Sequence, residues 1–290
     1  MKSYDLKRDI KIIMEYFSLS IEEFANEVGL SRQTIIDIMN GHNNVNKETL
    51  EKIYSYPYAS IRSLDINRTK ELLYLDEIHY GKLLFHGARG DIEGEVDTKH
   101  SVPPNDFGNG FYTGETLSQA ASWVAMRDNP SIYCFALKDM DSLKVIKFSA
   151  NLDWLFVVLY FRDTFYDYEP NEWILNLVKK VEEADLIVAP IADNEMFATI
   201  DSFARNEITD EACIHAISAS NLGIQYVFKN EKACKKLHFI DRLYLCEKER
   251  QEYLKIKDTL SEEGIQKSRL AKIEYRRKGK YFDELFKKKR

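Results

Sequence analysis

One strand and the turn that follows it constrain the fold more than any other part of the sequence. A short apolar strand is expected over 82–86 and ends in His86, and a polar loop comes next. A turn punctuated by glycines, 107–110, then delivers Phe111 and Tyr112 into the start of a helix. Glycine accepts backbone angles and close approaches that other residues do not tolerate. A glycine turn beside a histidine and a tyrosine therefore predicts a backbone built around a ligand.

Length and composition indicate a protein with a sizeable core. The chain has 290 residues, enough for one large domain or two modest ones, and 44% of them are hydrophobic while 30% are charged. Its apolar runs are shorter than the roughly 18 residues that span a bilayer, and its start lacks the pattern of a signal peptide. The four cysteines show no CxxC spacing, which is typical of reduced thiols. We therefore expect a cytoplasmic protein.

Charge is distributed unevenly along the chain. The net charge is −6, yet residues 255–290 contain 13 Lys or Arg against 6 Asp or Glu. This pattern is more typical of a charged helix that is merely solvated. The alternative is a basic tail that contacts the phosphates of nucleic acid.

The first segment, 1–66, shows helical periodicity throughout. Ser20 followed by Glu23 predicts a capping box at the start of a second helix. A third helix is expected to begin after Ser31 and to end at about residue 40. A fourth helix follows over 46–54, and Pro57 is expected to close the run.

The pattern over 18–56 resembles the helix-turn-helix domain of lambda-repressor-like (Xre-type) regulators. The residues that carry the resemblance are Ala25, Gly29, Ser31, Thr34, Ile35, Ile38, Gly41 and Leu50. In that fold the third helix enters the major groove, which implies that Arg32, Gln33 and Thr34 contact DNA. However, residues 1–66 contain 8 basic and 10 acidic side chains, whereas DNA binding needs a basic surface. A helical protein-interaction module stays the alternative.

After a connector over 67–80, with a short helix expected over 69–75, residues 81–246 predict a mixed α/β domain, and 247–290 predict a charged helical tail. The predicted strands cover residues 82–86, 132–137, 143–147, 186–191, 225–229 and 239–245. The predicted helices cover residues 116–126, 152–164, 171–183, 194–205 and 210–219. The fold class predicted for the whole chain is α+β.

The strand histidine and the tyrosine after the glycine turn resemble the first two motifs of the ADP-ribosyltransferase fold of the His-Tyr-Glu type. The chain is also similar to a bacterial domain family related to those transferases. The matching motifs are His86-Gly87, Asp106-Phe107-Gly108-Asn109-Gly110-Phe111-Tyr112-Thr113, Gln119-Ala120 with Trp123, Ala192-Asp193 with Met196-Phe197, and Gln225-Tyr226-Val227-Phe228-Lys229.

The resemblance implies that NAD is bound as a substrate. His86 would hold the ribose, the amide of Gly87 would face the nicotinamide, and Tyr112 would stack on that ring. Gln119 would orient the helix behind the site. Phe111 and Thr113 belong to the same cofactor-binding motif. For His86 and Tyr112 the alternatives are a strand-end histidine and a core aromatic residue without a ligand.

The third motif of the transferases departs from the pattern. Gln225 stands where the catalytic glutamate is usual, and an amide has no carboxylate to take a proton. Asp193 is the predicted substitute, with Asp106 and Glu195 as weaker candidates. A helix cap is the alternative role for Asp193.

The resulting hypothesis is an NAD-dependent ADP-ribosyltransferase-like effector that modifies a protein or nucleic acid, as a bacterial toxin with a possible antitoxin or as a phage-defence component. The alternative is a non-enzymatic DNA-binding regulator whose middle domain senses NAD or another nucleotide. No metal is expected, because His79, His86 and His100 lack the spacing of zinc ligands.

Overall fold

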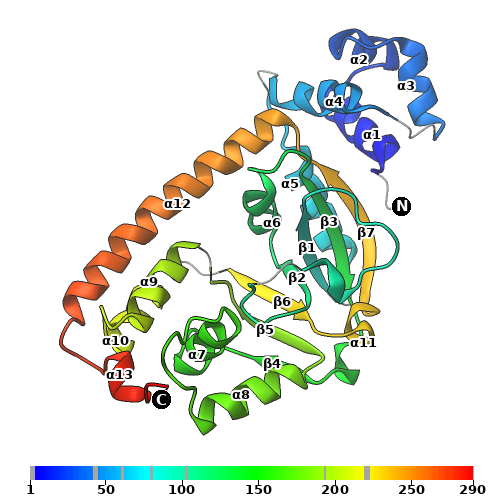
Figure 1. Ribbon diagram of the computed structural model, residues 1–290. Helices are drawn as coiled ribbons and strands as arrows, with labels where there is room; N and C mark the ends of the chain where they lie inside the picture. The colour runs from blue at the N-terminus through cyan, green and yellow to red at the C-terminus, as the bar shows by residue number, and fades with distance from the viewer. Residues whose placement is uncertain are drawn as a thin grey trace. The chain divides into compact units, whose positions relative to one another are not determined.

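The computed structural model describes residues 4–41, 45–59, 62–78, 81–101, 104–192, 194–218 and 223–289 (Figure 1). The chain divides into two compact units, and each is assembled from three separate stretches. Unit 1 consists of Met1–Glu95, Thr116–Lys138 and His238–Ile256. Unit 2 consists of Val96–Glu115, Asp139–Leu237 and Lys257–Arg290.

Unit 1 begins with the helices α1 (Leu6–Phe17), α2 (Ile21–Glu27), α3 (Arg32–Met39) and α4 (Lys47–Ala59). The predicted capping box of α2 is present, and the side chain of Ser31 accepts a hydrogen bond at the start of α3. Gly29 adopts φ +64° between α2 and α3, a left-handed conformation that suits glycine. These helices enclose an apolar core that includes Phe24, Ile35 and Ile53.

The sequence predicted that Pro57 would end the fourth helix. In the structure the helix continues past Pro57. This proline lies inside α4 and is buried, and its carbonyl accepts a hydrogen bond from the amide of Leu64. Proline removes one backbone donor from a helix. Burial of this ring near the end of α4 outweighs that loss, so helical structure continues to Ala59.

The rest of unit 1 combines helices with three strands. Its elements are α5 (Ile66–Glu77), β1 (Lys82–Ala88), α6 (Leu117–Val124), β3 (Ser131–Leu137), β7 (Leu237–Tyr244, in this unit from His238) and the start of α12 (Glu247–Glu274). The strand order is β1-β3-β7, and β1 pairs antiparallel with β3. The helix expected over 69–75 is the central part of the longer α5.

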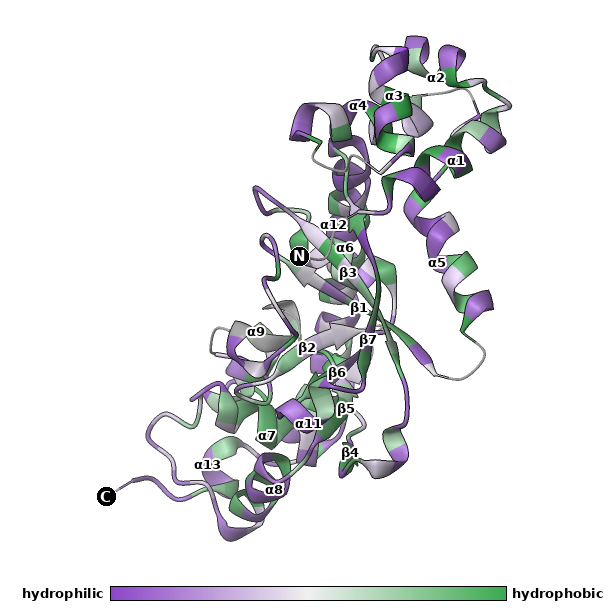
Figure 2. Cartoon of the chain, turned by 90° about the vertical axis from the view of Figure 1, so that its right-hand side faces the viewer, coloured by the Kyte–Doolittle hydropathy of each residue, from purple (hydrophilic) through white to green (hydrophobic). Residues whose placement is uncertain are grey.

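Unit 2 contains four strands in the order β4-β5-β6-β2, of which only the β4–β5 pair is parallel among the described residues. The strands are β2 (Phe111–Gly114), β4 (Val145–Lys147), β5 (Leu186–Pro190) and β6 (Ile224–Phe228). The helices are η1 (Thr98–His100), η2 (Met140–Ser142), α7 (Leu152–Phe161), α8 (Glu172–Glu182), α9 (Asn194–Ala204), α10 (Asp210–Ser218), α11 (Glu231–Cys234), the rest of α12, and α13 (Phe282–Leu285). Figure 2 shows the hydrophobic colouring of α7, whose residues 154–159 are all buried.

The aromatic pair after the glycine turn lies in a strand, not at the start of a helix as predicted. Phe111 and Tyr112 pair with Phe228 and Val227 of β6, and the helix begins only at Leu117, after Thr116 caps it. Aromatic residues favour strands, and here the partner strand decides the conformation. The six predicted strands and five predicted helices otherwise agree with the observed elements to within a few residues.

Two further features bear on the protein's chemistry. All four cysteines are free and buried, and burial raises the pKa of each thiol. Among the described helices, none has the length and apolar character that crossing a membrane requires.

Candidate functional site

The glycine turn of unit 2 is closed by the side chains of Tyr112 and Lys229. The hydroxyl of Tyr112 donates to the carbonyl of Gly108 at 2.6 Å and accepts from the amide of Phe107 at 3.2 Å. The ammonium of Lys229 donates to the carbonyl of Phe107 and, at 2.7 Å, to that of Asn109. The two side chains therefore fix the conformation of the turn through four hydrogen bonds, of which they donate three and accept one.

The glycines of this turn are required by packing. A Cβ atom on Gly110 would lie 2.7 Å from Cγ1 of Val227, and one on Gly108 would lie 3.0 Å from the ring of Phe161. Gly108 also adopts φ +69°. The turn thus sits directly against β6 and α7, and these contacts explain its glycines without a ligand.

Behind the turn lies a buried polar network centred on Asp106. One carboxylate oxygen accepts from the guanidinium of Arg162, at 2.8 Å from Nε and 2.5 Å from a terminal nitrogen. The other accepts from the amide of Ala192 at 3.1 Å and from Nε2 of Gln225 at 2.7 Å. The Gln225 amide also donates to the carbonyl of Pro190 at 2.9 Å. The network ties the turn to β5, β6 and α7.

This arrangement limits what the network can do chemically. Asp106 receives hydrogen bonds on both oxygens and neutralises an arginine, so it is poorly suited to take a proton from a substrate. Gln225 uses its amide hydrogens to hold Asp106 and a backbone carbonyl. Asp193 lies outside the described residues, and so does the side chain of Glu195. Whether a carboxylate acts beside Tyr112 stays a prediction.

Tyr112 and Gln225 lie on the same face of neighbouring strands. Tyr112 stands opposite Val227 and Gly114 stands opposite Gln225, and cross-strand partners point to the same face. The ring of Tyr112 packs at the margin of the unit 2 core, and burial raises the pKa of its hydroxyl. Burial also lowers the pKa of Lys229 to about 8.

The other predicted cofactor residues of unit 2 point into the protein. Phe111 is buried in the core, and the buried hydroxyl of Thr113 donates to the carbonyl of Tyr226 at 3.2 Å. These two side chains position β2 and Tyr112.

His86, Gly87 and Gln119 belong to unit 1. His86 is half-buried in β1 opposite Tyr133, and it has a further interaction within the chain. A Cβ atom on Gly87 would lie 2.6 Å from Cγ1 of Val124, so this glycine lets β1 approach α6 closely. Gln119 completes the capping box of α6. The meeting of His86 with Tyr112 and Gln225 in one pocket stays a prediction.

The predicted DNA-binding residues lie on the first turn of α3. Arg32 and Gln33 are exposed, and the Gln33 amide donates to the carboxylate of Asp37 at 2.7 Å. The hydroxyl of Thr34 lies 2.8 Å from that of Ser31 and is engaged in the helix cap. Arg32 and Gln33 are therefore the two predicted residues available to a duplex.

Comparison with known proteins places both parts of the chain. A family model described as "Protein of unknown function (DUF3990)" matches residues 83–239, more than half of the chain. The chain belongs to this family. A helix-turn-helix model matches residues 10–55. No curated protein and no solved structure matched the chain.

A buried ionic cluster fastens the helix-turn-helix to the strand β7, which begins at the end of the DUF3990 domain. The ammonium of Lys70 lies 2.6 Å from the carboxylate of Asp9 in α1 and 2.5 Å from that of Asp241 in β7. The hydroxyl of Tyr54 donates to Asp9, and that of Tyr74 donates to Asp241 at 2.5 Å. We call these five residues the ionic cluster.

Sequence analysis missed the ionic cluster because its members are far apart in the chain and carry no spacing pattern. Lys70 itself gave no signal of burial, because the polar residues Thr69 and Glu71 flank it in the sequence. The apolar core of α1–α4 likewise continues into Leu64, Ile66, Tyr244 and Cys246. Among the described residues of the family domain, no group of three His, Cys, Asp or Glu is placed to hold a metal ion.

Proposed function

We propose that this protein is a DNA-binding regulator whose DUF3990 domain senses NAD or another nucleotide. The match of residues 10–55 to the helix-turn-helix model supports a DNA partner. The exposed Arg32 and Gln33 at the start of α3 are the side chains that would read the major groove.

The ionic cluster is the observation that carries the proposal. Asp9 and Lys70 are both fully buried, so separating them would leave an uncompensated charge in the interior. Breaking a buried ion pair by removing one partner costs about 3–5 kcal/mol. A displacement of β7 or α5 would therefore be passed to α1 and to the helices that follow it. This coupling suits a regulator whose DNA-binding module responds to the rest of the chain.

The network around Asp106 favours sensing over catalysis. A catalytic base needs a free lone pair near the substrate, whereas Asp106 is fully engaged and Gln225 is an amide. His86, Gly87 and Tyr112, with the two motifs that contain them, remain the proposed contacts to the nucleotide.

A second candidate is the NAD-dependent ADP-ribosyltransferase-like effector, with a protein or nucleic acid as acceptor and a possible antitoxin as partner. The rigid turn around Tyr112 favours it. A ring held by two hydrogen bonds is preorganised to stack on nicotinamide at little entropic cost. In that case Asp193 would have to supply the carboxylate.

The DNA partner is tested by selection from a library of random-sequence duplexes with the full chain. We expect a short motif to be enriched by the wild type and lost with Arg32→Ala/Gln33→Ala. A matched control is Lys179→Ala/Lys180→Ala, which removes two exposed cations from α8. A library that shows no enrichment after repeated rounds contradicts the proposal.

The ligand is tested with labelled NAD. A sensor binds NAD, changes its affinity for the selected duplex and releases no nicotinamide. Tyr112→Ala should weaken NAD binding by about 1–3 kcal/mol, the scale of base–aromatic stacking. Nicotinamide release that depends on Asp193 would favour the transferase. Absence of NAD binding would end the transferase reading and would exclude NAD as the sensed nucleotide.

A further inference from the structure

A tight turn follows the C-terminal end of α12 and is held in place by α10. Gly279 adopts φ +82°, and a Cβ atom there would collide with the carboxylate of Asp210. That carboxylate accepts from the amide of Lys280 at 2.7 Å, and the Asp210 amide donates to the Lys280 carbonyl at 2.9 Å. The three residues before Gly279 are Arg276, Arg277 and Lys278, which we call the basic turn.

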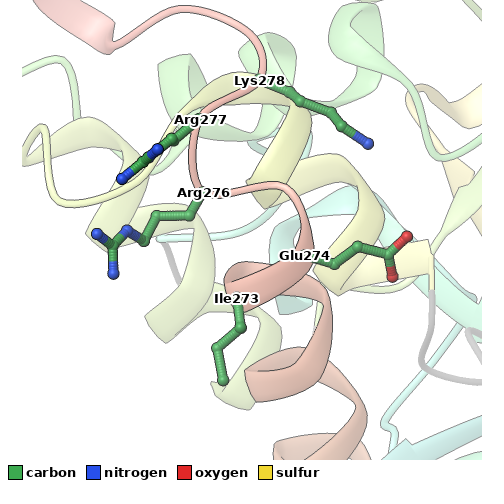
Figure 3. A pocket seen from close by; sticks show the side chains of 5 residues that line it. All are labelled: Ile273, Glu274, Arg276, Arg277 and Lys278. Carbon is green, nitrogen blue, oxygen red and sulfur yellow. The ribbon is translucent and has the colours of Figure 1, made fainter.

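The basic turn lines an open hollow of about 360 Å³, together with Ile273 and Glu274. Figure 3 shows the side chains of Arg276 and Arg277 extending to the same side of the turn, whereas Glu274 extends to the other side. Both arginines are exposed, and no described carboxylate forms an ion pair with either of them. Two neighbouring guanidinium groups are therefore available to a ligand.

Lys278 has a different environment. Its ammonium lies 4.3 Å from the centre of the Tyr275 ring, which stacks on His215 at 3.7 Å. The cation–π contact joins Lys278 to Tyr275, and the stacking of Tyr275 on His215 holds this side of the turn against α10. The arginines themselves lie just beyond the end of α12 at Glu274.

We propose that Arg276 and Arg277 bind the phosphates of double-stranded DNA and give the regulator affinity for DNA of any sequence. Guanidinium groups bind phosphate oxygens in a bidentate manner and are preferred for this contact. The choice of DNA as the occupant rests on the proposed function. The chemistry of the site, a pair of guanidinium groups for phosphate oxygens, stands without it.

Charge distribution supports this assignment. Residues 1–66 contain 8 basic and 10 acidic side chains, so the helix-turn-helix module supplies little attraction to phosphate. Residues 264–289 contain 10 basic and 3 acidic side chains. Counterion release makes phosphate contacts the main source of sequence-independent affinity. Within this basic stretch, the backbone that follows the basic turn is held by the two hydrogen bonds between Asp210 and Lys280.

The test measures binding of the full chain to a 30-base-pair random-sequence duplex as a function of NaCl concentration. We expect Arg276→Ala/Arg277→Ala to weaken binding about tenfold or more at low salt and to reduce the slope of log K against log salt by about 1.8, which is two phosphate contacts. The control Lys179→Ala/Lys180→Ala makes the same change in charge within unit 2 and should leave the slope unchanged. An Arg276→Lys/Arg277→Lys variant should keep the slope.

Three outcomes overturn the proposal. One is an arginine double variant with the slope of the wild type, and another is an equal loss in the lysine control. The third is displacement of the duplex by millimolar inorganic phosphate at constant ionic strength, which would assign the hollow to a small phosphate compound. A different pair of variants tests the proposed function independently of the basic turn. Arg32→Ala/Gln33→Ala should abolish motif selection yet retain the salt-dependent binding of random duplex, and the arginine double variant should do the reverse.

Discussion

Two lysines, one in each unit, hold structure together in opposite ways. Lys70 of unit 1 is fully buried between two carboxylates, and although burial lowers its pKa, Asp9 and Asp241 raise it overall. Lys229 of unit 2 is half-buried and is held by backbone carbonyls, and burial lowers its pKa to about 8. A lysine paired with carboxylates stays charged throughout the physiological range. A buried lysine that donates to backbone carbonyls, with a pKa of about 8, can lose its proton just above neutral pH.

This difference matches what each lysine does. Lys70 connects α1, α5 and β7, where a change of protonation would separate the helix-turn-helix from the strands. Lys229 closes a turn at the margin of a core by donating to two backbone carbonyls. The comparison yields four expectations, beginning with the largest.

Lys70→Met should lower the free energy of unfolding by about 3–5 kcal/mol, because it leaves Asp9 and Asp241 buried without a counter-charge. Urea denaturation of the full chain measures this. Lys52→Met removes an exposed pair with Glu48 and should cost less than about 1 kcal/mol. If the two substitutions lowered the free energy of unfolding equally, the ionic cluster would contribute no more to stability than an exposed ion pair.

Gln225→Glu should lower the free energy of unfolding by about 1–3 kcal/mol at pH 7, since the new carboxylate would face Asp106 and the carbonyl of Pro190. Protonation of the new side chain should recover part of this loss at lower pH. Gln119→Glu is the matched control, because a glutamate serves equally well in a capping box. A variant that is as stable as the wild type at pH 7 would show that the network is open to solvent.

Tyr112→Phe should cost about 1 kcal/mol, the value of the hydrogen bond from its hydroxyl to Gly108. Thermal or urea unfolding measures the change. Tyr160→Phe, whose hydroxyl makes no hydrogen bond among the described residues, is the control. If the phenylalanine variant binds NAD like the wild type, the hydroxyl serves only the turn.

Lys229→Met should show its effect most clearly in the pH dependence of stability. Because the folded pKa of about 8 lies below the unfolded value of 10.5, the unfolded chain binds more protons between these two pH values. The free energy of unfolding of the wild type should therefore rise with pH from about 8 to about 10.5. The slope is at most about 1.4 kcal/mol per pH unit, and solvent screening reduces it. The variant should lack this rise, and parallel curves for the two proteins would contradict the lowered pKa.

Local signals predicted most elements of the fold. The capping residues Ser20 and Ser31 and the periodicity around them located α2 and α3, and β-branched runs located six strands. The strand β2 was missed because its four residues form a strand only through pairing with β6. Pairing over more than a hundred residues of sequence leaves no local pattern.

The candidate site was predicted less completely. The motif that contains Asp106 and Tyr112 was recognised, but its glycines were read as ligand contacts, whereas Gly110 packs against Val227. The role of Gln225 as a partner of Asp106 depends on a contact between distant strands and loops. Sequence spacing reports which residues are near one another in the chain, and a buried network is assembled by tertiary packing.

The buried state of the four cysteines has a practical consequence. Thiols react with maleimide or haloacetamide dyes as thiolates, and burial keeps Cys134, Cys213, Cys234 and Cys246 protonated and shielded. A cysteine introduced at an exposed position will label far faster than the native ones, without their removal. Gln33→Cys and Arg277→Cys would place a donor and an acceptor dye on α3 and on the basic turn. Energy transfer between them would then report how far apart in solution the two elements lie that we propose to contact DNA, and whether a duplex changes that separation.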